Sequence, residues 1–162
     1  MIYQKKRMMI KIDLLKNHSH TIPMLAKIWH EGIGKIWMPE ISVEESRTLY
    51  EEELQQDMPL TYVALDGNIP IGSCTLELDA GIRSDLKPWL GDLVVATKYQ
   101  KQGIGKMLID VAVEKAKALG FKKLYLFTFD PAITEYYQRL GWKKIGMDEF
   151  KLHPVTVMEK GL

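Results

Sequence analysis

The chain has 162 residues, 46% of them hydrophobic, and its 22 basic residues balance 21 acidic ones. This length and apolar fraction predict one domain, residues 1–162, with an ordinary core. The balanced charge excludes a general attraction to nucleic acid or acidic membranes, and no apolar run approaches the roughly 18 residues of a transmembrane helix.

Three features argue against export, disulfide bonding and metal binding. Residues 1–6 carry charge, but the apolar core of a signal peptide does not follow them, so we expect a cytoplasmic protein. The single cysteine, Cys74, cannot form an internal disulfide, and its alternating surroundings predict a buried or half-buried strand thiol. His30 and His153 are isolated and lack the spacing of metal ligands, so we expect no metal site.

The chain begins with patterns for one strand and one helix. Loose alternation of apolar and polar residues over residues 8–14 predicts the strand. The apolar face of residues 23–29 predicts a helix that Gly32 and Gly34 end or loosen. An irregular stretch over residues 36–41 follows.

A capped helix and a hairpin come next. Ser42, with Glu45 three residues later, has the capping-box pattern, and the helix that it begins should end near residues 57–59. Strand patterns on both sides of Asp66-Gly67-Asn68 predict a hairpin over residues 60–78.

The second half of the chain predicts a β-α-β unit and a closing antiparallel pair. The apolar, β-branched run over residues 93–96 predicts a buried strand, and the 3.6-residue period of residues 103–118 predicts a helix. A parallel strand over residues 123–129 completes the unit. The last expected elements are a helix over 131–140 and two strands over 142–147 and 155–159, joined by residues 148–154.

The segment between this strand and helix has the features of an anion site. Gly103 and Gly105 open the helix, and the first N–H groups of a helix lack partners and carry partial positive charge. Glycine lets a ligand approach the backbone closely, and Lys101 and Lys106 add positive charge. The sequence therefore predicts phosphate binding here.

Two well-known phosphate motifs do not fit this segment. A Walker P-loop needs Ser or Thr after Lys106, where Met107 stands. A Rossmann fingerprint needs a third glycine where Leu108 stands, and its first glycine follows the strand directly. Here about seven residues separate Val95 from Gly103.

A third pattern does fit. Gln100, Gly103 and Gly105 fill [QR]-x-x-G-x-[GA], which resembles the coenzyme A pyrophosphate motif of the GCN5-related N-acetyltransferase (GNAT) family. The resemblance covers roughly residues 60–160.

Residues 130–142 carry a second resemblance to the same family. Tyr137 is followed, after three residues, by Gly141 and an aromatic residue, as in family members. The family often has Asn where Asp130 stands and Ala where Ile133 stands, so the first half of this motif matches less well.

The resemblance implies an α/β (α+β) fold, with a mixed, mostly antiparallel sheet of about six to seven strands and about four flanking helices. The central parallel strands would splay apart after Val95, and the pantetheine arm of acetyl-CoA would pair with backbone groups of Leu93 and Val95. The residues implied to bind acetyl-CoA are Leu93, Val94, Val95, Gln100, Lys101, Gln102, Gly103, Ile104, Gly105 and Lys106.

Acetyl transfer from a thioester to an amine needs a deprotonated amine, donors for the developing oxyanion and a proton for the leaving thiolate. The resemblance implies Tyr137 as the acid, although an aromatic residue packed on a helix would give the same pattern. The candidates for the base are Asp92, Glu77 and Asp79, and the sequence does not choose among them. All three could instead be solvated surface charges. In the family the base often acts through water, and no single position is universal.

The acceptor pocket is expected between the amino-terminal helices, the hairpin and the closing strands. Trp29, Trp37, Glu31 and Trp89 lie near it in this arrangement, and aromatic rings beside a carboxylate could hold a cation. Trp29 and Trp89 are also expected in the core, whereas Trp37 belongs to an irregular segment, which favours pocket lining.

We therefore expect an acetyl-CoA-dependent N-acetyltransferase that acetylates a primary amine of a small molecule or peptide by direct attack in a ternary complex. One alternative is a non-catalytic acyl-CoA sensor on the same fold. Another is a helical interaction module, which leaves the glycine loop unexplained. Expected partners are acetyl-CoA and the amine, without nucleic acid or membrane. Family members are often dimers, and the strand over residues 155–159 is expected as a pairing edge.

Overall fold

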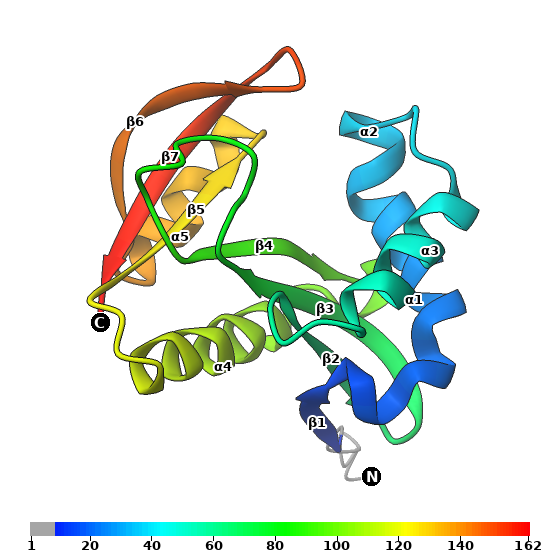
Figure 1. The fold of residues 1–162 in the computed structure, drawn as a ribbon. Coiled ribbons are helices and arrows are strands. Elements are labelled where there is room, and N and C mark those ends of the chain that lie inside the picture. The colour runs from blue at the N-terminus through cyan, green and yellow to red at the C-terminus, as the bar shows by residue number, and fades with distance from the viewer. Residues whose placement is uncertain (1–8) are drawn as a thin grey trace, which may run out of the picture.

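The computed structural model describes residues 9–162, which form a mixed seven-stranded sheet with helices on both faces (Figure 1). Only β4 and β5 run parallel, and the other neighbours are antiparallel. The predicted fold class is therefore confirmed. In sheet order the strands are β1 (Ile10–Leu14), β2 (Leu60–Asp66), β3 (Ile69–Glu77), β4 (Trp89–Val95), β5 (Lys123–Thr128), β7 (His153–Gly161) and β6 (Lys143–Phe150).

The helices divide between the two faces of the sheet. One face carries α4 (Ile104–Ala118) and α5 (Thr134–Arg139), and the other carries α1 (Ile22–Trp29) and α3 (Val43–Glu53). Neighbouring residues of β2 point to opposite cores, because side chains alternate along a strand. Tyr62 and Ala64 join the α4 core, whereas Val63 and Leu65 join the α1–α3 core.

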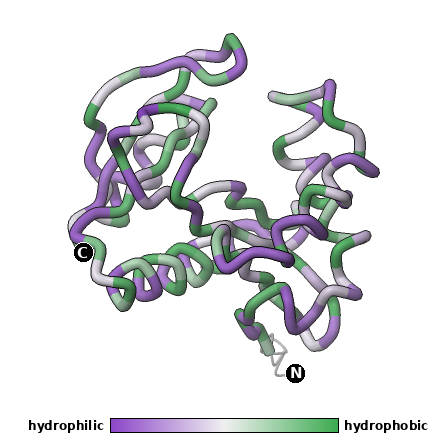
Figure 2. Tube along the Cα trace, in the orientation of Figure 1, coloured by the Kyte–Doolittle hydropathy of each residue, from purple (hydrophilic) through white to green (hydrophobic). Residues whose placement is uncertain are grey.

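The pattern of α4 shows why this segment is helical. Figure 2 shows apolar and polar residues alternating along it, and its buried side chains recur at helical spacing. These buried residues are Ile104, Leu108, Ile109, Ala112 and Ala116. Within residues 9–162, the structure contains no helix with the length and apolar character that crossing a membrane requires.

The amino-terminal elements differ slightly from expectation. Of the two predicted outcomes at Gly32 and Gly34, the helix is loosened and does not end, because a π-helical turn over His30–Gly34 leads into α2 (Lys35–Trp37). The predicted cap is confirmed, since the Glu45 N–H donates to Ser42 Oγ at 3.0 Å. However, α3 ends at Glu53, before the predicted end near residues 57–59. Residues 1–8, which include part of the predicted first strand, lie outside the described residues.

The parallel strands β4 and β5 pair at only one position. Trp89 stands opposite Tyr125, and the Tyr125 N–H donates to the carbonyl of Pro88 at 3.0 Å. Beyond this point the strands diverge, and Figure 1 shows β5, β7 and β6 turned away from the rest of the sheet. The splay that the family resemblance implied is therefore present, but it begins beyond Trp89 and not after Val95.

Two expectations about the carboxyl-terminal hairpin were wrong. Residues 148–154 do not form a long connection, because β6 and β7 are joined by the two-residue turn of Lys151 and Leu152. The strand over residues 155–159 is not an edge, because β7 lies between β5 and β6. The edge strand on this side of the sheet is β6, and only its last three residues, 148–150, had been assigned to the connection.

We expect Gly34→Ala to destabilise the protein by about 1–3 kcal/mol, because a Cβ at this position would lie 2.6 Å from Cζ3 of the buried Trp29 ring. Gly161→Ala is the matched control, since its Cβ would meet nothing within 4 Å. Urea titration of both variants measures the difference. Equal unfolding free energies would show that Trp29 moves aside freely.

Candidate active site

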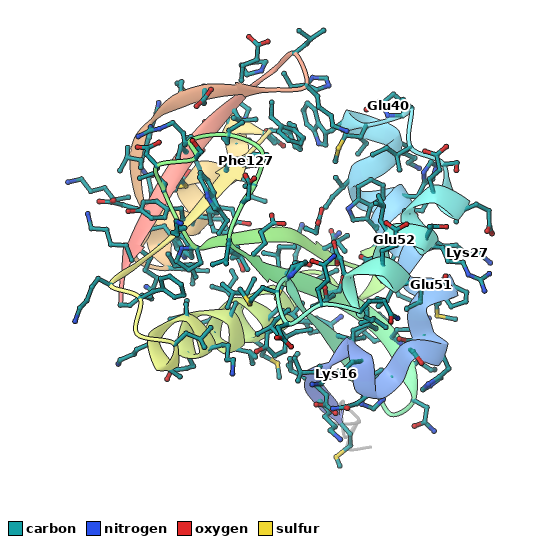
Figure 3. All side chains as sticks on the ribbon, viewed as in Figure 1. Lys16, Lys27, Glu40, Glu51, Glu52 and Phe127 are labelled. Carbon is teal, nitrogen blue, oxygen red and sulfur yellow. The ribbon has the colours of Figure 1, made fainter. Side chains whose placement is uncertain are left out.

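A cavity of about 390 Å³ lies where β4 and β5 diverge. One wall is formed by Leu90–Leu93 of β4, and the facing wall by residues 126–130 on and after β5. Tyr137 of α5 and Trp37 of α2 complete it. In Figure 3, Phe127 of β5 and Glu40, just after α2, lie on opposite sides of this opening. We call this cavity the cleft.

The predicted phosphate loop leads from β4 into α4. Lys101 and Gly103 adopt left-handed backbone conformations, with φ of 61° and 83°. Gln100 Nε2 donates to the carbonyl of Val95 at 3.0 Å, and Gln102 Nε2 donates to that of Lys98 at 3.3 Å. These bonds fix the loop against the end of β4.

The start of α4 has the shape and charge of an anion site. Its first turn holds no acidic residue, and a Cβ at Gly103 would meet nothing within 4 Å. Ile104 anchors the turn in the core, whereas Lys106 is exposed and pairs with Asp110 at 2.7 Å. At Gly105 an added Cβ would lie 3.3 Å from the Tyr136 hydroxyl. The residues present therefore fit the diphosphate of acetyl-CoA.

The last residues of β4 divide their backbone groups between β3 and the cleft. The Ala96 N–H donates to the carbonyl of Ile71 on β3 at 2.7 Å. Since peptide groups alternate along an antiparallel strand, those of Val94 point to β3 as well, and those of Val95 point away from β3, where its carbonyl accepts from Gln100. The register shifts just before this, at Asp92 and Leu93, where Asp92 has a φ of 49°.

Tyr137 reaches the cleft from the α5 side. Its side chain is 7% exposed and packs against the rings of Trp142 and Tyr136. Burial raises the pKa of Tyr137 well above its usual value near 10, so its hydroxyl stays protonated at neutral pH. A protonated hydroxyl at this position could serve as an acid.

Asp92 and Glu77, two of the predicted base candidates, are half-buried on neighbouring strands. Asp92 Oδ1 accepts a hydrogen bond from Trp29 Nε1 at 3.0 Å, and the carboxyl group lines the cleft. Burial raises the pKa of Asp92, which the bond from Trp29 opposes. Burial, and then the charge of Asp92, raises the pKa of Glu77 to about 8.

A third carboxylate, Glu53, was missed by the sequence reasoning. Burial, and then the charge of Asp92, raises the pKa of Glu53 to about 7. In the sequence it ends a run of charged residues on α3, which favours an exposed position. However, Ser46 and Tyr50 are buried on the same helix, and spacing of three or four residues places Glu53 on their face. This periodicity is the signal that could have identified it.

A second cavity of about 190 Å³, which we call the side pocket, adjoins the cleft. The two cavities share Met38, Asp92 and Phe150. The other residues that line the side pocket come from α1, α3 and the segment between α2 and α3: Trp29, Ile41, Ser46, Leu49, Tyr50 and Glu53.

The remaining predicted residues lie elsewhere or have structural roles. Asp79 is exposed and accepts from the Gly81 N–H at 2.8 Å, outside the linings of both cavities. Glu31 is exposed and pairs with Lys35, while Trp89 is fully buried. Trp37 lines the cleft as expected, with its ring stacked on Phe129 and its edge toward His153. Cys74 is buried, as expected. In the described part of the chain no group of three or more metal-ligating side chains could hold a metal ion.

Comparison with known proteins shows that residues 27–142 match the acetyltransferase (GNAT) family. The chain is 33% identical over 118 residues to N-alpha-acetyltransferase 30 of Saccharomyces cerevisiae, covering 68% of this chain and 67% of the relative. It is 26% identical over 124 residues to N-alpha-acetyltransferase 30 of Schizosaccharomyces pombe, covering 75% of this chain and 83% of the relative.

Solved structures share the fold. An aminoglycoside 6'-N-acetyltransferase complexed with coenzyme A superposes with a TM-score of 0.75 at 19% identity, covering 93% of this chain and 96% of that chain. Aminoglycoside 6'-acetyltransferase type Ii superposes with a TM-score of 0.74 at 22% identity, covering 93% of this chain and 96% of that chain.

The buried carboxylates predict a loss of stability with rising pH. A carboxyl group whose pKa is raised by folding stabilises the folded state fully below its unfolded pKa, and this stability is lost as pH rises through the folded pKa. For Glu53 and Glu77 that loss occurs as pH approaches about 7 and about 8. The ligand-free Tm should therefore fall between about pH 5 and pH 9.

The Tm of the Glu77→Gln variant should fall less steeply with pH over this range than that of the wild type, because the amide cannot ionise. Thermal scans in matched buffers measure the slope, with Glu52→Gln, an exposed position on α3, as the control. A Glu77→Gln slope equal to that of the control would contradict the raised pKa.

Proposed function

Because the chain belongs to the acetyltransferase (GNAT) family, we propose that its cleft binds the thioester of acetyl-CoA beside a primary amine and promotes direct acetyl transfer to the amine nitrogen. The chain is an acetyl-CoA-dependent N-acetyltransferase by this membership. The observation that carries the proposed mechanism is that Tyr137 and Asp92 line one cavity, which lies between β4 and β5.

The phosphate loop and the open edge of β4 bind the donor. The first N–H groups of α4, together with Lys101 and Lys106, hold the diphosphate, because the helix N-terminus and both side chains are positive. Leu93 and Val95 offer backbone groups to the pantetheine arm where β5 leaves them unpaired. One of these N–H groups stabilises the oxyanion that develops on the thioester carbonyl.

Tyr137 supplies a proton to the leaving thiolate. The raised pKa keeps its hydroxyl protonated, and its place in the cleft wall brings it near the donor. Solvent at the open side of the cleft returns the proton afterwards.

Asp92 is the group that we assign to receive the proton of the ammonium, with Glu77 as the alternative. An alkylammonium has a pKa of about 10 and lacks the lone pair that attacks the thioester. A carboxylate whose pKa is raised by burial accepts such a proton more readily than an exposed one. Asp92 is the better placed of the two, since it lines both cavities.

Thiol release from acetyl-CoA across a panel of small amines and peptide amino termini tests the function. We expect turnover with at least one primary amine and a mass increase of one acetyl group on that amine. Binding of CoA without turnover on any acceptor would favour the non-catalytic sensor instead.

Tyr137→Phe should lower kcat by about 100-fold while the Kd for CoA changes by less than about twofold, because only the acid is removed. Tyr136→Phe is the matched control, as it deletes the same hydroxyl one residue away. Steady-state rates at saturating substrates and calorimetric titration of CoA provide the two readouts. Unchanged turnover in Tyr137→Phe would remove this residue from the mechanism.

Gly103→Ala should weaken CoA binding by about tenfold or more, because the new Cβ enters the space in front of the α4 N-terminus. Gly120→Ala is the control, since Gly120 has a φ of 91° and, like Gly103, an added Cβ there would meet nothing within 4 Å. Both variants therefore carry similar backbone strain. Equal CoA affinities in the two variants would contradict the placement of the diphosphate.

A further inference from the structure

The two cavities contain carboxylates that have no positive counterpart. In the described part of the chain no Lys, Arg or His lines either cavity. Asp92 and Glu53 line these cavities, whereas Glu77 lies outside both linings. Within residues 9–162, none of the three forms an ion pair with a basic side chain. Buried carboxylates close together are costly without a cation, so a positively charged ligand is the natural complement.

Glu53 is held in place on the far side of the side pocket. Its Oε2 accepts a hydrogen bond from Thr61 Oγ1 at 2.9 Å, and Thr61 Oγ1 lies 3.3 Å from Thr75 Oγ1. Thr61 is 4% exposed and Thr75 is 1% exposed. The carboxylate is therefore pre-positioned before any ligand arrives.

Between Glu53 and Asp92 the side pocket offers apolar and aromatic surface. Trp29 and Tyr50 contribute rings, and both are about nine-tenths or more buried, with 6% exposure each. Phe150 closes the boundary with the cleft. An alkyl chain fits such a wall, whereas its ends need polar partners.

One carboxylate is sufficient to receive the proton of the reacting amine. Asp92 meets that need from the boundary of the two cavities, which leaves Glu53 with no role in the chemistry. The surroundings add negative charge, because α3 carries five glutamates and a single basic residue, Arg47. In Figure 3, Glu51 and Glu52 lie on α3 and Glu40 lies beside α2. This field attracts cations to the acceptor side of the sheet.

We propose that the acceptor is an aliphatic diamine or polyamine, with one amino group beside Asp92 in the cleft and a second, charged ammonium group paired with Glu53 in the side pocket. This inference rests on the proposed function. The reacting ammonium gives one proton to Asp92, and its nitrogen then attacks the thioester carbon, so that a C–N bond forms and the C–S bond breaks. The nitrogen releases its second proton to solvent as the amide forms. The thiolate takes its proton from Tyr137, and the second ammonium keeps its own.

The test compares 1,4-diaminobutane with n-pentylamine, which has the same chain length but a methyl group in place of the second ammonium group. We expect kcat/KM for the diamine to exceed that for the monoamine by about tenfold or more, as for a desolvated charge pair. A peptide without basic side chains serves as the third acceptor, and should also be slower than the diamine.

Glu53→Gln tests the assigned partner of the second ammonium. It should reduce the ratio of diamine to monoamine kcat/KM to within about threefold, because the amide keeps the shape but loses the charge. Glu52→Gln, one residue away and exposed, should retain the wild-type ratio. Thermal melting and CoA titration establish that both variants are folded and bind the donor.

Three outcomes would overturn the inference. The first is a kcat/KM for the monoamine that equals that for the diamine, and the second is a kcat/KM for the peptide that exceeds both. The third is a Glu53→Gln variant that keeps the wild-type ratio of diamine to monoamine kcat/KM. If CoA binds but no amine or peptide releases thiol, the proposed acetyltransferase function itself fails.

Discussion

The incomplete pairing of two parallel strands is the constraint on which the rest of the site depends. β4 and β5 are matched only at Trp89 and Tyr125, so beyond this point the edges of the two strands that face each other lack a strand partner. Unpaired backbone groups are costly unless a ligand or water satisfies them. The gap therefore both creates the cavity and selects for a ligand with amide-like groups of its own. The pantetheine arm of acetyl-CoA is such a ligand.

Charge is distributed in opposite senses on the two sides of this gap. The start of α4 is positive through its unpaired N–H groups and nearby lysines. The other side holds Asp92 and Glu53 in the cavity linings, with Glu77 on the neighbouring strand β3. This distribution suits our proposal that the phosphates of the donor and the ammonium groups of the acceptor bind on opposite sides of the gap. Burial, and then the charge of Asp92, raises the pKa of both glutamates, which suits the proton transfer that we propose near neutral pH. Trp29, which lines the side pocket with Asp92, donates a hydrogen bond to its carboxylate.

The sequence predicted those parts of the fold and site that depend on local pattern. The helix after Gly103 and the cap at Ser42 each rest on neighbouring residues, and each is present. The order of strands depends on contacts far apart in sequence, and this is why the edge role of residues 155–159 was wrong. Glu53 was missed for a related reason, since its burial comes from packing against β2 and not from its charged neighbours. Similarly, Asp79 is exposed because it lies beyond the end of β3, whereas the half-buried Glu77 and Asp92 lie on paired strands.

The separation of the two cores by one sheet bears on how this chain could diversify. Adjacent residues of β2 belong to different cores, with Ala64 packed toward α4 and Val63 toward α1 and α3. Substitutions in the segment over residues 22–53 can remodel the acceptor pocket without disturbing the packing beneath the phosphate loop. Such an arrangement lets acceptor preference drift over evolutionary time while the donor stays constant.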